Sequence, residues 1–224
     1  MAHTSGAPTG KSYRVAGWTG VASGLTGLIA FGLLVTALAG RISGGDERAW
    51  EHLIRAHDVG VILQSIFMLP VVFALYNLGC QQSLKVSRIA LSLGLVALSL
   101  IVLFLVLTIA KAIWDVLYML PQGLLGFWLI AVNRSMSPTF PKSLRILGTI
   151  AGAGLVLVAV FPIGYAAFVD SLGLHGPVPF DYVPPQAVIA NVVVHLILLI
   201  GTFMGVPTYP VWAALLGRKL LHMS

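Results

Sequence analysis

The chain has 224 residues, of which 58% are hydrophobic and only 9% are charged. Soluble domains are typically about 45–50% apolar and about 25% charged, so this composition excludes an ordinary soluble enzyme and a disordered chain. The 13 Lys and Arg residues outnumber the 7 Asp and Glu residues. No basic tract with interleaved aromatic residues occurs, so we expect no nucleic-acid partner. The single cysteine, Cys80, excludes a disulfide framework.

Six stretches are long and apolar enough to cross a membrane, which takes about 20 residues. In chain order they cover residues 18–39, 59–78, 89–110, 113–132, 146–169 and 187–206. The connections between them are too short to hold a soluble domain. We therefore expect an all-α polytopic membrane helix bundle. One six-helix domain covers residues 18–216, between tails at residues 1–17 and 217–224.

The two ends of this region need separate interpretation. The first stretch ends in an A-x-A-like pattern at residues 37–39, as secretory signals do. It is longer than the apolar region of a signal and carries Gly20 and Gly24 at G-x-x-x-G spacing, so we expect a retained helix that packs closely. After the sixth stretch, residues 207–210 (PTYP) predict a bend. Residues 211–221 are then expected to lie along the cytoplasmic interface.

Charge predicts the orientation. If six helices alternate in direction, most Lys and Arg residues fall on the side of the termini, namely Lys11, Arg14, Lys85, Arg88, Arg134, Lys142, Arg145, Arg218 and Lys219. By the positive-inside rule we expect both termini to be cytoplasmic, and we expect the protein in the inner (plasma) membrane. All the acidic residues fall on the outer side, namely Asp46, Glu47, Glu51, Asp58, Asp115, Asp170 and Asp181.

Polar side chains inside the hydrocarbon are costly and therefore mark candidate functional residues. Asp58, at the expected start of the second helix, shares a face with Ser65, while His57 and Gln64 share a neighbouring face. The fourth helix carries a stripe at i, i+3 and i+7, and the sixth a pair at i and i+4. The stripe is Asp115, Tyr118 and Gln122, the pair is Asn191 and His195, and Tyr165 approaches the same outer half on the fifth helix.

If these faces meet, they line a polar cavity that opens outward. Burial of a carboxyl there disfavours its charged form, so it would serve as a general acid. We expect Asp115 first and Asp58 second in that role, with His195 as base or substrate partner. Gln64, Tyr118, Gln122, Tyr165 and Asn191 would orient a substrate. Asp181 and Tyr182, in a proline-rich outer loop, would lie above the cavity or rest in the headgroup region.

Structural readings compete with each of these roles. Lys111 and Asp115 are spaced for an i, i+4 ion pair, and a carboxylate at a helix start also favours the helix dipole. Asp58 is open to the same reading. His195 beside Asn191 suits an interhelical hydrogen bond. His52 and His57 are five residues apart and fall on different faces, so we expect no metal site and no cofactor.

Residues 121–129 (PQGLLGFWL) and 209–218 (YPVWAALLGR) resemble small six-helix bacterial membrane proteins of unknown function. The resemblance covers mainly the second to sixth helices. It implies the architecture and supplies no catalytic motif.

The leading functional hypothesis is a membrane-embedded enzyme that performs acid–base chemistry on a lipid or isoprenoid-like apolar substrate. The alternative is a non-catalytic accessory or scaffold subunit that packs through its glycine faces against membrane-protein partners or a second copy. The third is a small-molecule transporter, which the small size and the lack of a visible repeat disfavour. Membrane lipids are expected partners in each case.

Overall fold

The computed structural model describes residues 10–44, 47–81, 88–136, 139–170 and 189–223. These form long helices and, within the described ranges, no strand. The helices are α1 (Gly10–Ile42), α2 (Glu47–Gln81), α3 (Arg88–Ile109), α4 (Met119–Ser135), α5 (Lys142–Phe168), α6 (Ile189–Gly205) and α7 (Thr208–Leu221), with a 3-10 turn η1 (Asp115–Tyr118) before α4. Six spans, with α6 and α7 counted as one, are long and apolar enough to cross a membrane. The six-helix membrane bundle is confirmed.

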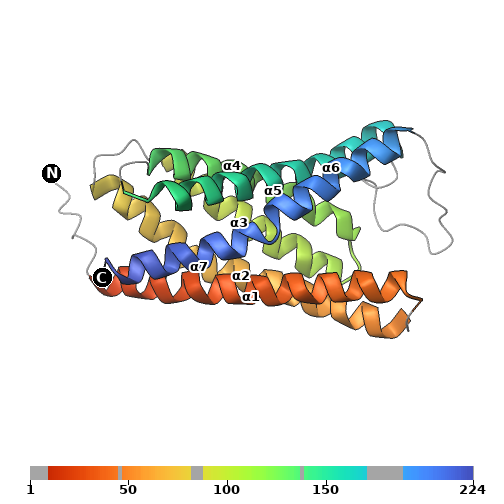
Figure 1. The fold of residues 1–224 in the computed structure, drawn as a ribbon, viewed down its shortest axis with the longest axis horizontal. Coiled ribbons are helices and arrows are strands. Elements are labelled where there is room, and N and C mark those ends of the chain that lie inside the picture. The colour runs from red at the N-terminus through yellow and green to blue at the C-terminus, as the bar shows by residue number, and fades with distance from the viewer. Residues whose placement is uncertain (1–9, 45–46, 82–87, 137–138, 171–188, 224) are drawn as a thin grey trace.

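Both described ends of the chain lie at one end of the bundle. Figure 1 shows the start of α1, the end of α7 and the connection from α4 to α5 together at the left, and the α1–α2 turn at the right. The helices therefore alternate in direction, as six consecutive crossings require.

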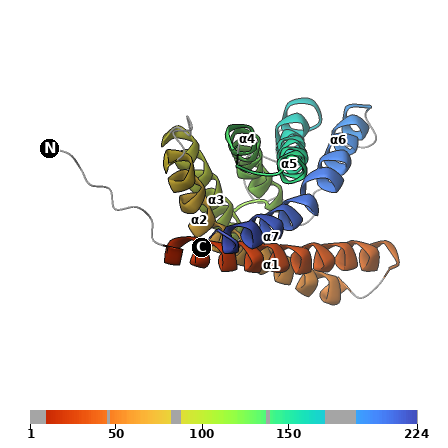
Figure 2. The same cartoon turned by 60° about the vertical axis from the view of Figure 1, so that its left-hand side comes forward.

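The helices pack mainly along neighbours in sequence, with α7 as the exception. The extensive pairs are α1 with α2 and α7, α4 with α5, and α5 with α6. Figure 2 shows α4, α5 and α6 fanning out from the layer that α1 and α7 form. Helix α6 stands at the edge of this fan, and its lipid-facing side chains are largely exposed, for example Phe203 at 66%.

The prediction that residues 211–221 lie along the membrane interface is wrong. Helix α7 is part of the core, where Trp212, Leu216 and Leu220 are fully buried. Close packing on α1 explains this, because a Cβ at Gly20 would lie 2.9 Å from the Cα of Gly217. The basic Arg218 suggested an exposed helix, and its own side chain is exposed while the opposite face of α7 is buried.

Glycines at G-x-x-x-G spacing serve these contacts, as the sequence predicted. Gly24 accepts Pro210 and Ala214 of α7, and Gly152 lies against Gly126 of α4. Two further pairs have this spacing, Gly148 with Gly152 and Gly201 with Gly205. Gly20, Gly148, Gly201 and Gly205 also meet helices of the same chain. The glycine faces are therefore occupied within the protein.

Candidate functional site

A cavity of about 270 Å³ lies in the half of the bundle nearer the α1–α2 turn. We call it the central cavity. Its walls come from every helix and are mostly apolar, namely Leu34, Leu38, Val61, Ile101, Met119, Leu125, Leu155, Val158, Leu198 and Val206. Its polar lining residues are His57, Gln64, Ser65, Tyr118, Gln122, Thr202 and Tyr209. Apolar walls with a few convergent polar groups are typical of small-molecule sites.

The α2 wall is held by contacts with α1. The Nδ1 atom of His57 lies 2.9 Å from the carbonyl oxygen of Ala30, and the hydroxyl of Ser23 donates to the carbonyl of Gln64 over 3.0 Å. All of these side chains are buried. Gly60 permits the close approach, because a Cβ there would lie 2.8 Å from the Cβ of Ala30.

The Ala30 bond fixes the chemistry of the His57 ring. A carbonyl oxygen only accepts, so Nδ1 donates its proton to it. In the neutral ring the other nitrogen, Nε2, then carries a lone pair. Nε2 has no hydrogen-bond partner among the described residues. His57 therefore offers the central cavity an oriented acceptor, which is the arrangement of a general base.

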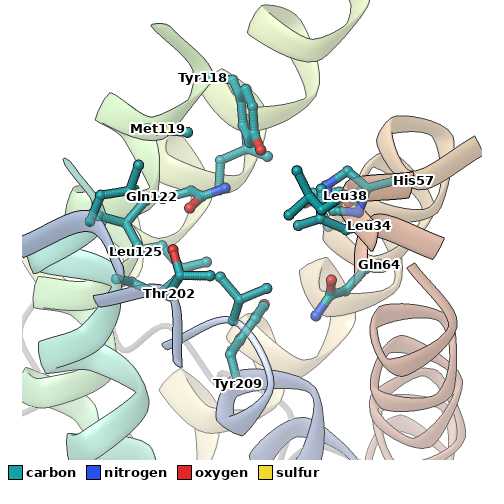
Figure 3. A pocket seen from close by; sticks show the side chains of 17 residues that line it. Leu34, Leu38, His57, Gln64, Tyr118, Met119, Gln122, Leu125, Thr202 and Tyr209 are labelled. Atoms are coloured by element: carbon teal, nitrogen blue, oxygen red, sulfur yellow. The ribbon is translucent and has the colours of Figure 1, made fainter. Parts of the chain in front are cut away.

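Three buried polar atoms around the central cavity have no hydrogen-bond partner in the described part of the chain. They are Nε2 of Gln64, Oε1 of Gln122 and the hydroxyl of Tyr209. Figure 3 shows these side chains approaching one space from α2, α4 and α7. A buried polar group without a partner costs about 1–3 kcal/mol. Three such atoms belong to side chains that line one cavity, which makes these residues the candidate ligand contacts.

Glycine makes room for one of these amides. The amide of Gln64 lies over Gly27 of α1, and a Cβ at residue 27 would lie 2.6 Å from its Cδ. On α7, the ring of Tyr209 stacks on the buried Trp212 with centroids 6.3 Å apart. Trp212 in turn donates to the buried Asn133 of α4 over 3.2 Å. Contacts with neighbouring helices and side chains therefore hold Gln64 and Tyr209 in place.

The structure brings together part of the predicted site. Gln64, Tyr118 and Gln122 all line the central cavity, so the polar faces of the second and fourth helices do meet. Tyr165, Asn191 and His195 do not line it. Tyr165 and His195 lie in a separate aromatic cluster, where the His195 ring is 5.1 Å from that of Phe161 and 6.3 Å from that of Tyr165.

His195 also makes a different hydrogen bond from the expected one. It is exposed, and its Nδ1 lies 2.8 Å from the carbonyl oxygen of Asn191 in its own helix. This bond from residue i to residue i−4 engages Nδ1 within α6, and the expected interhelical hydrogen bond stays a prediction. The separation from the central cavity leaves His195 without a place in the chemistry of that cavity.

The two candidate acids, Asp58 and Asp115, lie at other positions in their helices than the sequence predicted. Asp58 does not open a helix, because α2 begins at Glu47, and the reading as an N-terminal carboxylate is wrong. Asp58 is buried and has an interaction partner, and it does not line the central cavity. Asp115 begins η1, and its side chain lies outside the described structure.

The helical geometry expected for Lys111 and Asp115 is also wrong. Lys111 lies in the turn after α3 with a φ of 56°, in the left-handed region, so residues 111–115 do not form a helical i, i+4 pair. Asp181 and Tyr182 lie outside the described residues.

Sequence reasoning missed four polar residues of the central cavity as site residues. His57 and Ser65 were noted only as neighbours of Gln64 and Asp58 on the second helix. Thr202 lies before the α6–α7 break and Tyr209 after it, and no spacing within one helix relates them to α2 or α4.

The described residues contain no group of three or more His, Cys, Asp or Glu side chains placed to hold a metal ion. No protein-family model, curated protein or solved structure matches the chain. The protein is therefore a multi-pass membrane helix bundle that contains a small-molecule-sized cavity.

Proposed function

We propose that the protein binds a lipid or isoprenoid-like molecule with a small polar end in the central cavity. The observation that carries the proposal is the set of three unpartnered buried atoms on Gln64, Gln122 and Tyr209. The apolar walls would hold the remainder of the molecule, because burial of apolar surface is favourable. Ordered water would satisfy the same polar atoms, and the experiment below separates the two occupants.

The polar atoms limit the chemistry of the ligand. Gln64 offers an N–H donor, Gln122 offers a carbonyl acceptor, and the hydroxyl of Tyr209 does both. A molecule that satisfies all three carries an acceptor and a donor close together. A carboxylic acid, a primary amide and a hydroxyl next to a carbonyl have this property.

The membrane is the expected source of such a molecule. Leu34 and Leu38 of α1 and Thr202 of α6 line opposite sides of the central cavity (Figure 3). These two helices do not form one of the extensive packing pairs, and Leu38 is 46% exposed. Entry between α1 and α6 would let an apolar molecule reach the site without leaving the hydrocarbon. By the positive-inside rule this half of the bundle is the outer half of the inner membrane, with both termini cytoplasmic.

The chemistry best supported by these groups is proton transfer, with His57 as the base. Its Nδ1 is oriented by Ala30, and its Nε2 is available to a bound molecule. This replaces His195 in the mechanism expected from the sequence. Asp115 remains the proposed acid, and its replacement by Asn tests that role directly. Asp58, expected from the sequence as the second acid, does not line the central cavity and has no part in this proposal.

The scaffold alternative has less support. It required glycine faces open to partner proteins, and the glycines at G-x-x-x-G spacing instead contact helices of this chain. We therefore identify no surface that would serve an accessory subunit. No observation specifically favours a transporter.

The proposal is tested by extracting small molecules from protein purified in mild detergent and identifying them by mass spectrometry. Wild type is compared with Tyr209→Phe and with Tyr165→Phe, a matched hydroxyl deletion outside the central cavity. A single enriched compound that is lost in Tyr209→Phe and kept in Tyr165→Phe supports the proposal. An extract of bulk lipid, the same in all three proteins, contradicts it and indicates a water-filled cavity.

A further inference from the structure

A second site lies at the opposite end of the bundle, between the end of α4 and the start of α5. It is a cleft of about 300 Å³, which we call the basic cleft. It is lined by Asn133, Arg134, Lys142, Arg145, Ile146, Thr149 and Ile150. Three of these side chains are cationic and none is acidic.

Acidic side chains are far from this cleft in the described part of the chain. Asp and Glu are absent from residues 116–169. Every acidic residue that the structure describes lies in the first half of α2, in η1 or just after α5, toward the other end of the bundle. The charges of Arg134 and Lys142 therefore meet no described carboxylate in this cleft.

The start of α5 adds to the positive potential. Free N–H groups and the helix dipole place partial positive charge at a helix N-terminus, where acidic residues are favourable. Helix α5 has no acidic residue in its first turn and no side-chain cap at Pro141, and it begins with Lys142. A bound anion would offset both the dipole and the side-chain charges.

The cleft continues as an apolar strip. Ile146 and Ile150 follow one turn apart on α5, and their side chains are 48% and 38% exposed. A ligand that fits the whole cleft therefore has an anionic head at the cations and a hydrocarbon part along the isoleucines. We propose that the basic cleft binds the phosphate group of an acidic phospholipid, with an acyl chain against Ile146 and Ile150.

The test measures the thermal unfolding midpoint (Tm) of the full chain in a neutral detergent with added phosphatidylglycerol, phosphatidylcholine or inorganic phosphate. Phosphatidylglycerol is expected to raise Tm by about 5 °C at 100 times its Kd. Equal stabilisation by inorganic phosphate would identify a soluble phosphate as the source and would still support an anion site. Equal stabilisation by phosphatidylcholine contradicts the proposal.

The double variant Arg134→Gln, Lys142→Gln is compared with Arg14→Gln, Arg218→Gln. All four side chains are exposed and lie at the same end of the bundle, so both variants should fold and both lose two charges. Only the first pair lines the cleft. Its loss should weaken phosphatidylglycerol binding about 30-fold, from the usual contribution of a cation near a lipid surface. Equal weakening of phosphatidylglycerol binding in the second variant would show only a general attraction between basic residues and anionic lipid. That result would contradict the proposed site.

Discussion

The Nδ1 atom of His57 lies 2.9 Å from the carbonyl oxygen of Ala30, which links the second helix to the first at the wall of the central cavity. The contact is buried and joins residues from different helices, so it persists only while α1 and α2 stay packed. It leaves Nε2 as the ring atom available to a ligand. The orientation of this ring is therefore a property of the fold and does not require a ligand.

This arrangement predicts the tautomer of His57. In protein labelled with ¹⁵N-histidine, the neutral His57 ring should carry its proton on Nδ1, because the Ala30 oxygen accepts it. The signal is assigned by its loss in His57→Gln. Observation of the Nε2–H tautomer at His57 would remove the oriented base from the proposed mechanism.

Removal of the Tyr209 hydroxyl should have opposite effects on stability and on binding. Since the buried hydroxyl has no partner among the described residues, Tyr209→Phe should raise the free energy of unfolding of the ligand-free protein by about 1 kcal/mol. It should also weaken ligand retention. Both quantities are measured on the same preparation, by denaturation in detergent and by mass spectrometry of the extract.

A fall in the free energy of unfolding by more than about 1 kcal/mol would indicate that the hydroxyl makes a structural hydrogen bond. The stability of Tyr165→Phe serves as the reference for removing a tyrosine hydroxyl elsewhere in the bundle.

Gly27→Ala should disturb the central cavity although Gly27 itself does not line it. The new Cβ would occupy the position of the Gln64 amide and force that side chain to move. We expect ligand retention to fall and stability to fall by about 1–3 kcal/mol, the usual range for overpacking. Retention equal to wild type would show that the position of the Gln64 amide does not matter for binding.

Gly154→Ala should weaken the attachment of α6. A Cβ at residue 154 would overlap the backbone of Gly205, which cannot move away as a flexible side chain can. Gly32→Ala is the matched control, because a Cβ at Gly32 meets nothing within 4 Å. Measured by thermal unfolding, Gly154→Ala should lower Tm, and Gly32→Ala should leave it unchanged or raise it, since alanine favours helix over glycine by about 0.5–1 kcal/mol.

Equal effects of the two substitutions would contradict the close contact of α5 and α6. A loss confined to Gly154→Ala would show that α6, which otherwise faces lipid widely, is held by this glycine contact.

Hydrophobic length predicted the membrane spans well, because a helix that crosses the hydrocarbon must be apolar over about 20 residues. It did not give the helix ends. Residues 47–58 are too polar to count as a span, yet they continue α2 outward, and this placed Asp58 inside the helix and not at its start. Likewise the charge of Arg218 suggested an interface, while the opposite face of α7 carries Trp212 and Leu216 into the core.

The candidate site was predictable along single helices and not between them. The spacing of Tyr118 and Gln122 placed both on one face, and the structure confirms that both line the central cavity. His195 on α6 and Tyr165 near the end of α5 were expected at a similar depth, but their side chains contact each other outside the central cavity. Which faces converge depends on helix order in space, which spacing within a helix does not encode.

The central claim is that Gln64, Gln122 and Tyr209 hold a small molecule in the central cavity. Native mass spectra of the full chain, released from mild detergent, test this most directly, with Tyr209→Phe and Tyr165→Phe recorded beside wild type. We predict one discrete added mass in wild type and Tyr165→Phe that is reduced or absent in Tyr209→Phe. A bare wild-type protein, or the same distribution of lipid adducts in all three, would contradict the claim.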